Sequence, residues 1–115
     1  MNKRQIGTKY EEKAILYLKD NGYKILKKNF RNRIGEIDII ALNDDYICFI
    51  EVKERSSKRC GLGMEAVTLK KQKNIIKVAK YYLYINKYNI NQNVRFDIVS
   101  IDEEKITLIK NAFIS

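Results

Sequence analysis

The sequence predicts one α/β domain, in which a central mixed β-sheet is flanked by helices in the order α-β-β-β-α-β-β. Two segments show helical periodicity, and five short apolar segments have the length and flanking turn residues of strands. Strands interrupted by a helix typically form a sheet with helices packed on its faces. The 115 residues, of which 45% are hydrophobic, suffice for one core and are too few for two. We therefore expect residues 1–115 to form a single domain.

The first predicted helix covers residues 5–21 and ends at a typical stop signal, Asn21-Gly22. The second covers residues 65–87. Apolar residues recur at helical spacing in both, at Ile6, Ala14, Ile15 and Leu18 in the first and at Ile75, Ile76, Ala79 and Leu83 in the second.

The predicted strands are residues 23–30, 35–42, 46–53, 94–101 and 105–110. Asn43-Asp44-Asp45 separates the second strand from the third and predicts a hairpin. Asp102-Glu103-Glu104 predicts a turn between the last two strands. Residues 54–63 form a polar, basic loop.

Composition restricts the chemistry that the chain can perform. Histidine is absent, which excludes Ser-His and Cys-His catalysis and histidine metal sites, and the two cysteines form no zinc motif. No apolar run is long enough to cross a bilayer and no signal peptide is evident, so we expect a cytoplasmic protein without a membrane partner. The net charge of +9 suits nucleic acid, although lysine can also accumulate without a partner.

The predicted hairpin carries a charged cluster formed by Asp38, Glu51 and Lys53. Glu51 and Lys53 face the same side of their strand because side chains alternate with period two. A tight turn at Asp44-Asp45 brings Asp38 opposite Glu51, with Cβ atoms about 5 Å apart. A slip of one residue in the pairing would send them to opposite faces.

Two carboxylates in this position repel each other, and a divalent cation between them would remove the repulsion. Ligands that are all oxygen favour a hard ion, Mg²⁺ or Mn²⁺. The alternative is a salt-bridge cluster in which Lys53 neutralises Asp38 and Glu51.

Two polar residues share the apolar stripes of the helices. Glu11 aligns with Ala14 and Leu18, so it is either buried beside a partner such as this site or exposed at the edge of the stripe. Gln72 begins the stripe of the second helix, where it either reaches the end of the sheet or lies at the rim. Periodicity alone leaves both pairs of alternatives open.

Basic residues near the hairpin could bind the phosphates of a nucleic acid. They are Arg31, Arg33, Arg55, Lys58 and Arg59. Because phosphate contacts carry no base information, we expect recognition of backbone or shape. A solvated basic turn is the alternative for the residues of the loop.

The arrangement Asp38 … Glu51-Val52-Lys53 resembles the core of the PD-(D/E)xK nucleases, which have a restriction-endonuclease-like fold. Over nearly its whole length the chain also resembles the YraN-like family of uncharacterised bacterial proteins. The segments that carry this resemblance are Ile6-Gly7, Glu11, Ala14, Tyr17-Leu18, Gly22 to Leu26, Asn29, Arg31, Gly35 to Ala41, Phe49 to Lys53, Arg55, Gly61, Glu65 to Val67, Lys71-Gln72 and Arg95 to Asp97. One departure is Tyr10, where the family usually has Gly.

The resemblance implies that Asp38, Glu51 and the Val52 carbonyl bind Mg²⁺ or Mn²⁺ and that Lys53 orients the attacking water. It further implies that Glu11 holds a water and that Gln72 or Lys71 assists near the phosphate. The expected function is metal-dependent endonuclease activity on DNA, in branched or single-stranded form. A resolvase-like role would require a homodimer. The alternative is a non-catalytic nucleic-acid-binding module that retains the fold.

Overall fold

The computed structural model describes residues 3–54, 67–102 and 105–114, with side chains from residue 9 onward. These residues form helix α1 (Lys3–Asp20), strands β1 (Lys24–Arg31), β2 (Glu36–Asn43) and β3 (Tyr46–Glu54), helix α2 (Leu69–Ile85), and strands β4 (Val94–Ile101) and β5 (Ile106–Phe113). The predicted element order is therefore confirmed. The main differences are that α2 begins at Leu69 and that β5 continues to Phe113.

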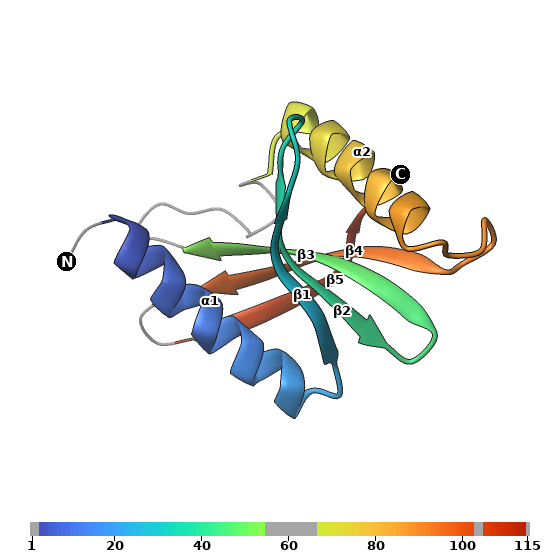
Figure 1. Cartoon of the computed structure of the whole chain (residues 1–115). Helices are drawn as coiled ribbons and strands as arrows, with labels where there is room; N and C mark the ends of the chain where they lie inside the picture. Colours follow the sequence, from blue (N-terminus) through green and yellow to red (C-terminus); the bar gives the residue numbers. More distant parts are fainter. Residues whose placement is uncertain (1–2, 55–66, 103–104, 115) are drawn as a thin grey trace.

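The strands form one mixed sheet in the order β1-β2-β3-β4-β5. β3 and β4 are parallel, whereas the other neighbouring pairs are antiparallel. A parallel pair needs a crossover connection, and α2 lies in the connection between β3 and β4. Figure 1 shows α1 on one face of the sheet and α2 over the other. The prediction of a mixed sheet flanked by helices is confirmed.

Each helix covers its own apolar cluster. Beneath α1, the fully buried side chains include Ala14, Leu18, Ile39, Ala41, Cys48 and Ile50. Beneath α2, the buried side chains include Ile37, Ile40, Ile47, Phe49, Ile75, Val78, Ala79, Tyr82, Phe96 and Ile98. Side chains of β3 therefore alternate between the two clusters, and the same alternation turns Glu51 and Lys53 toward the α2 face.

The buried face of α2 is rotated from the predicted stripe. Ile76 and Leu83 are half-buried, whereas Val78 and Tyr82 are buried. The cause is the β1–β2 hairpin, whose end bends toward α2 (Figure 1). Phe30 on this hairpin packs edge-to-face against Tyr82, with ring centroids 5.1 Å apart. A contact between distant parts of the sequence thus decides which residues of α2 are buried.

Helix α1 ends at the predicted stop signal. Gly22 adopts a φ of 87°, a left-handed conformation that glycine takes without strain. The Tyr23 N–H donates to the Leu18 carbonyl at 3.0 Å and closes the last turn. Among the described residues, neither helix has the length and apolar character needed to cross a membrane.

Candidate metal and phosphate site

The β2–β3 hairpin has the register that the sequence predicts. Asn43 pairs with Tyr46, and Ile39 pairs with Ile50. Asp44 in the turn has a φ of 55°, which Asp tolerates better than most residues. Continued by one step, this register brings Asp38 level with Glu51.

Asp38 lies where β2 separates from β3. The backbone pairing of β2 with β3 ends at Ile39, whereas pairing with β1 continues to Glu36. Beyond this point the Val52 N–H donates to Asp38 Oδ2 at 2.9 Å. The Asp38 carboxylate therefore accepts a bond that a backbone carbonyl would otherwise accept, and this bond fixes it beside the Glu51–Lys53 segment.

Glu51 is a buried carboxyl group with an unsatisfied oxygen. The residue is 2% exposed, and Oε1 has no hydrogen-bond partner among the described residues. Oε2 lies 3.9 Å from Lys71 Nζ at the start of α2. Burial and then the adjacent Asp38 raise the Glu51 pKa to about 9, and Lys71 and Lys53 only partly oppose this. At neutral pH without a cation, Glu51 therefore carries a proton.

Lys53 follows Glu51 on the same face of β3 and is half-buried. Burial lowers its pKa, and the nearby Lys71 ammonium lowers it further, whereas Glu51 and Asp38 act in the opposite direction. A lysine with a lowered pKa exchanges its proton more readily near neutral pH.

Glu11 of α1 approaches the same end of the sheet. It is half-buried, and its pKa is raised by burial and then by the negative charge of Asp38. A hydrogen bond with the Asn29 side chain opposes the rise. Asn29 has a φ of 51° in β1. Glu11 is thus neither fully buried nor fully exposed, and Asp38 is among the charges that act on it.

Ser100 is a further polar residue at this site, and sequence reasoning missed it. It pairs with Lys53 in the parallel β3–β4 ladder. It is 3% exposed, and its Oγ has no hydrogen-bond partner among the described residues. The sequence signal that could have found it is a serine between two apolar strand residues, Val99 and Ile101. Strand alternation turns its side chain to the α2 face, as it does those of Phe96 and Ile98.

The donor set at this end of the sheet fits a hard divalent ion. Among the described residues, no group of three or more acidic, cysteine or histidine side chains forms a ready cage. Mg²⁺ does not need one, because it keeps several waters and is often bound by one or two carboxylates. Asp38 and Glu51 supply two carboxylates, and Glu51 Oε1 is a buried oxygen to which no other described residue is hydrogen-bonded. An incoming cation would displace the Glu51 proton and satisfy that oxygen.

Comparison with known proteins shows the family. A sequence model described as "Uncharacterised protein family UPF0102" matches residues 10–101. The chain belongs to this family. A UPF0102 protein of Acetivibrio thermocellus is 49% identical over 97% of the chain and 93% of its own length. A UPF0102 protein of Clostridioides difficile is 47% identical over 98% of the chain and 100% of its own length. One of Lachnoclostridium phytofermentans is 46% identical over 98% of the chain and 96% of its own length.

The family part of the resemblance is thus confirmed for UPF0102, the YraN-like family. These names state no activity, so a function has to be inferred from the residues of the site.

The other predicted residues of this UPF0102 protein have different surroundings. Gln72 Nε2 donates to the Val67 carbonyl at 3.0 Å, which orders the start of α2 next to Lys71. Arg31 pairs with Glu36 at 2.8 Å. Arg33 is exposed. The remaining predicted phosphate contacts, Arg55, Lys58 and Arg59, lie outside the described residues.

A buried ionic network lies on the opposite face of the sheet from Glu51. Asp97 is fully buried and accepts hydrogen bonds from Arg95 Nε at 3.0 Å, from the Tyr23 hydroxyl at 3.0 Å and from the Asn111 N–H at 2.8 Å. Arg95 also donates to Asn43 Oδ1 at 2.9 Å. Because both oxygens of Asp97 have partners, this network is structural, in contrast to Glu51.

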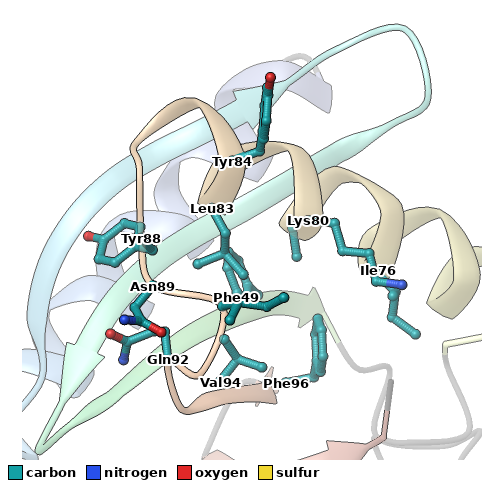
Figure 2. A pocket seen from close by; sticks show the side chains of 12 residues that line it. Phe49, Ile76, Lys80, Leu83, Tyr84, Tyr88, Asn89, Gln92, Val94 and Phe96 are labelled. Carbon is teal, nitrogen blue, oxygen red and sulfur yellow. The ribbon is translucent and has the colours of Figure 1, made fainter.

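A hollow of about 480 Å³ lies between α2, the following loop and the sheet (Figure 2). Apolar and aromatic side chains such as Phe49, Leu83 and Phe96 form most of its lining. None of the described residues that line it is a carboxylate, so these residues do not offer the ligands of a hard metal ion.

Proposed function

We propose that this protein is a metal-dependent endonuclease with a restriction-endonuclease-like fold, and that it hydrolyses phosphodiester bonds in DNA. The observation that carries the proposal is the buried Glu51 Oε1 beside Asp38, which has no hydrogen-bond partner in the part of the chain that the structure describes. A fold that needed only stability would gain from an apolar residue at this position, because an unsatisfied buried carboxyl is costly. A ligand that completes the site explains why the carboxyl is there.

Asp38, Glu51 and the Val52 carbonyl would hold Mg²⁺ or Mn²⁺, which would polarise the phosphate and lower the pKa of water. The hydrogen bond from the Val52 N–H orients Asp38 for this role before any ligand arrives. Such pre-organisation reduces the cost of assembling the site.

Lys53 and Lys71 are the cationic groups that would act on the substrate. The lowered pKa of Lys53 suits it to orient the attacking water and to accept its proton. Lys71 reaches the Glu51 carboxyl from the start of α2 and would stabilise the charge that develops on the phosphate. Gln72 would act indirectly, through its bond to the Val67 carbonyl. Glu11 would hold a water at the outer side of Asp38.

The substrate is DNA recognised through its backbone. The net charge of +9 favours a polyanion, and Arg33 offers an exposed guanidinium near the tip of the β1–β2 hairpin. Arg31, Arg55, Lys58 and Arg59 would add phosphate contacts without reading bases. Cutting both strands of a branched substrate would require a second copy of the chain.

A cleavage assay tests the proposal. The purified protein is incubated with single-stranded, nicked, flapped and four-way DNA in Mg²⁺ or Mn²⁺. We expect cleavage of at least one substrate and a loss of at least about 100-fold in Glu51→Gln and Lys53→Ala. Glu54→Gln is the matched control, because Glu54 is an exposed carboxylate on the same strand, and it should cleave like the wild type.

Two results would contradict the proposal. One is the absence of cleavage of every substrate in either metal. The other is equal cleavage by Glu51→Gln and the wild type. DNA binding that persists in EDTA and in Asp38→Ala, together with no cleavage, would favour a non-catalytic binding module.

A further inference from the structure

The distribution of charged residues in α2 does not favour the stability of the helix. Residues 69–85 contain five lysines and no acidic residue. The helix dipole favours acidic groups in the first turn and basic groups in the last, but α2 has no acid in its first turn and no base in its last. Lysines three or four residues apart also repel one another. Helix stability therefore does not account for this pattern, whereas a bound polyanion would.

Four exposed residues form one row on the outer side of α2. The buried face contains Ile75, Val78, Ala79 and Tyr82. On the opposite side lie Lys73, Lys77, Lys80 and Tyr84, which are all exposed. Their spacing of four, three and four residues keeps them on one face. This row, called the α2 row below, is about 16 Å long at 1.5 Å per residue.

Tyr84 is an unusual residue at the end of the α2 row. It is 82% exposed. Figure 2 shows its side chain pointing away from the other labelled residues of the hollow. Burial therefore does not explain this large aromatic ring, and most of its surface is open to solvent and available for stacking.

The α2 row begins close to Lys71 in sequence, but on another side of the helix. Lys73 lies in the same part of α2 as Lys71, whose Nζ is 3.9 Å from Glu51 Oε2. Residues two apart on a helix face different sides, so a strand bound along the row would have to pass around α2 to reach Glu51.

We propose that the α2 row binds a single-stranded segment of DNA, an inference that rests on nucleic acid being the partner in the proposed function. Lys73, Lys77 and Lys80 span about 10 Å. Neighbouring lysines of the row are about 4.5–6 Å apart along the helix axis, so each can contact a separate phosphate of an extended single strand. Tyr84 stacks on a base, which must be unpaired to offer its face. The ligand is therefore single-stranded DNA or a single-stranded tail.

Binding measured by fluorescence anisotropy in EDTA tests the lysines of the row without any cleavage. The triple variant Lys73→Gln, Lys77→Gln, Lys80→Gln should bind a single-stranded oligonucleotide about 100-fold more weakly at low salt. Its slope of log affinity against log salt should be shallower by about 2, because each lost phosphate contact contributes about 0.7.

A second triple variant provides the matched control. Lys13→Gln, Lys19→Gln, Lys24→Gln removes the same charge from exposed lysines on α1 and at the start of β1. It should keep an affinity within a few-fold of the wild type. Equal weakening by the two triple variants would overturn the proposal, because it would show a general effect of net charge.

Variants at Tyr84 test whether the ligand of the α2 row is single-stranded DNA. Tyr84→Ala should weaken single-strand binding about tenfold and leave blunt duplex binding unchanged, whereas Tyr84→Phe keeps the ring and should bind like the wild type. Equal effects of Tyr84→Ala on single strand and duplex would overturn the choice of ligand.

Different results would refute the proposed nuclease activity and the proposed binding to the α2 row. A wild type that cleaves DNA, with an α2-row variant that still binds single strands normally, would refute the α2 row alone. A wild type that cleaves nothing, with an α2-row variant that loses single-strand binding, would refute the nuclease and support the row. A wild type that does not bind single-stranded DNA would refute the row.

Discussion

Glu51→Gln should change how the stability of the fold depends on pH. In the folded chain without metal, burial and Asp38 raise the Glu51 pKa from 4.5 to about 9. In the unfolded chain the group returns to its ordinary value. Below pH 4.5 both states hold the proton, and the stabilising contribution is fully present. As the pH rises toward 9 the unfolded chain has lost the proton and the folded chain keeps it, so the contribution is lost progressively.

The size of the effect follows from one proton. Between pH 6 and 8 the folded state binds about one more proton at Glu51 than the unfolded state. The free energy of unfolding of the wild type should therefore fall by about 1.4 kcal/mol per pH unit relative to Glu51→Gln, or about 2.7 kcal/mol over this interval. Glutamine does not titrate, so the variant lacks this component.

Urea denaturation at several pH values in EDTA measures the difference. With a urea dependence of about 1–3 kcal/mol per M, the midpoint of the wild type should move relative to the variant by about 1–3 M. Saturating Mn²⁺ should remove the extra pH dependence, because Glu51 would then be ionised in the folded state as well. Parallel pH profiles of wild type and variant in EDTA would refute a protonated, buried Glu51.

Three further changes test the surrounding structure, each by the free energy of unfolding in denaturant. Asp38→Ala should cost about 1–3 kcal/mol because the Val52 N–H loses its acceptor, and Asp38→Asn should restore most of this; equal losses would contradict the role of that bond. Ser100→Ala should stabilise the fold by about 1 kcal/mol by removing an unsatisfied buried hydroxyl, and a clear loss would show that the hydroxyl has a partner. Asp97→Ala should cost about 3–5 kcal/mol because Arg95 is left without its carboxylate; a loss below 1 kcal/mol would contradict the structural role of the network.

The hairpin could be predicted from the sequence because its determinants are local. Asp44 and Asp45 mark a tight turn, and such a turn fixes the register of both strands. This was sufficient to predict that Asp38 and Glu51 meet. The detail that Asp38 binds the Val52 N–H depends on where β2 leaves β3, and the β2–β3 turn does not encode that position.

Long-range packing explains what the sequence did not reveal. The apolar residues of α2 allow more than one buried face, and the contact of Phe30 with Tyr82 selects Val78 and Tyr82 over Ile76 and Leu83. Gln72 had two open alternatives, and its bond to Val67 depends on the path of the chain into α2. Such contacts lie outside the repeating pattern of a single helix or strand, and periodicity carries no information about them.

Ser100 was missed for a different reason. One hydroxyl in an apolar strand is common and usually finds a backbone partner. Its significance comes from pairing with Lys53 across the parallel β3–β4 ladder, and the pairing of two strands separated by a helix cannot be read from either strand alone.

The most direct test of the central claim is a crystal structure of the protein soaked in Mn²⁺, with anomalous diffraction used to locate the ion. We predict an anomalous peak bound by the carboxylates of Asp38 and Glu51, and no such peak in crystals of Glu51→Gln. An absent peak at this end of the sheet in the wild type, or one that persists unchanged in Glu51→Gln, would contradict the assignment of Asp38 and Glu51 as a metal site.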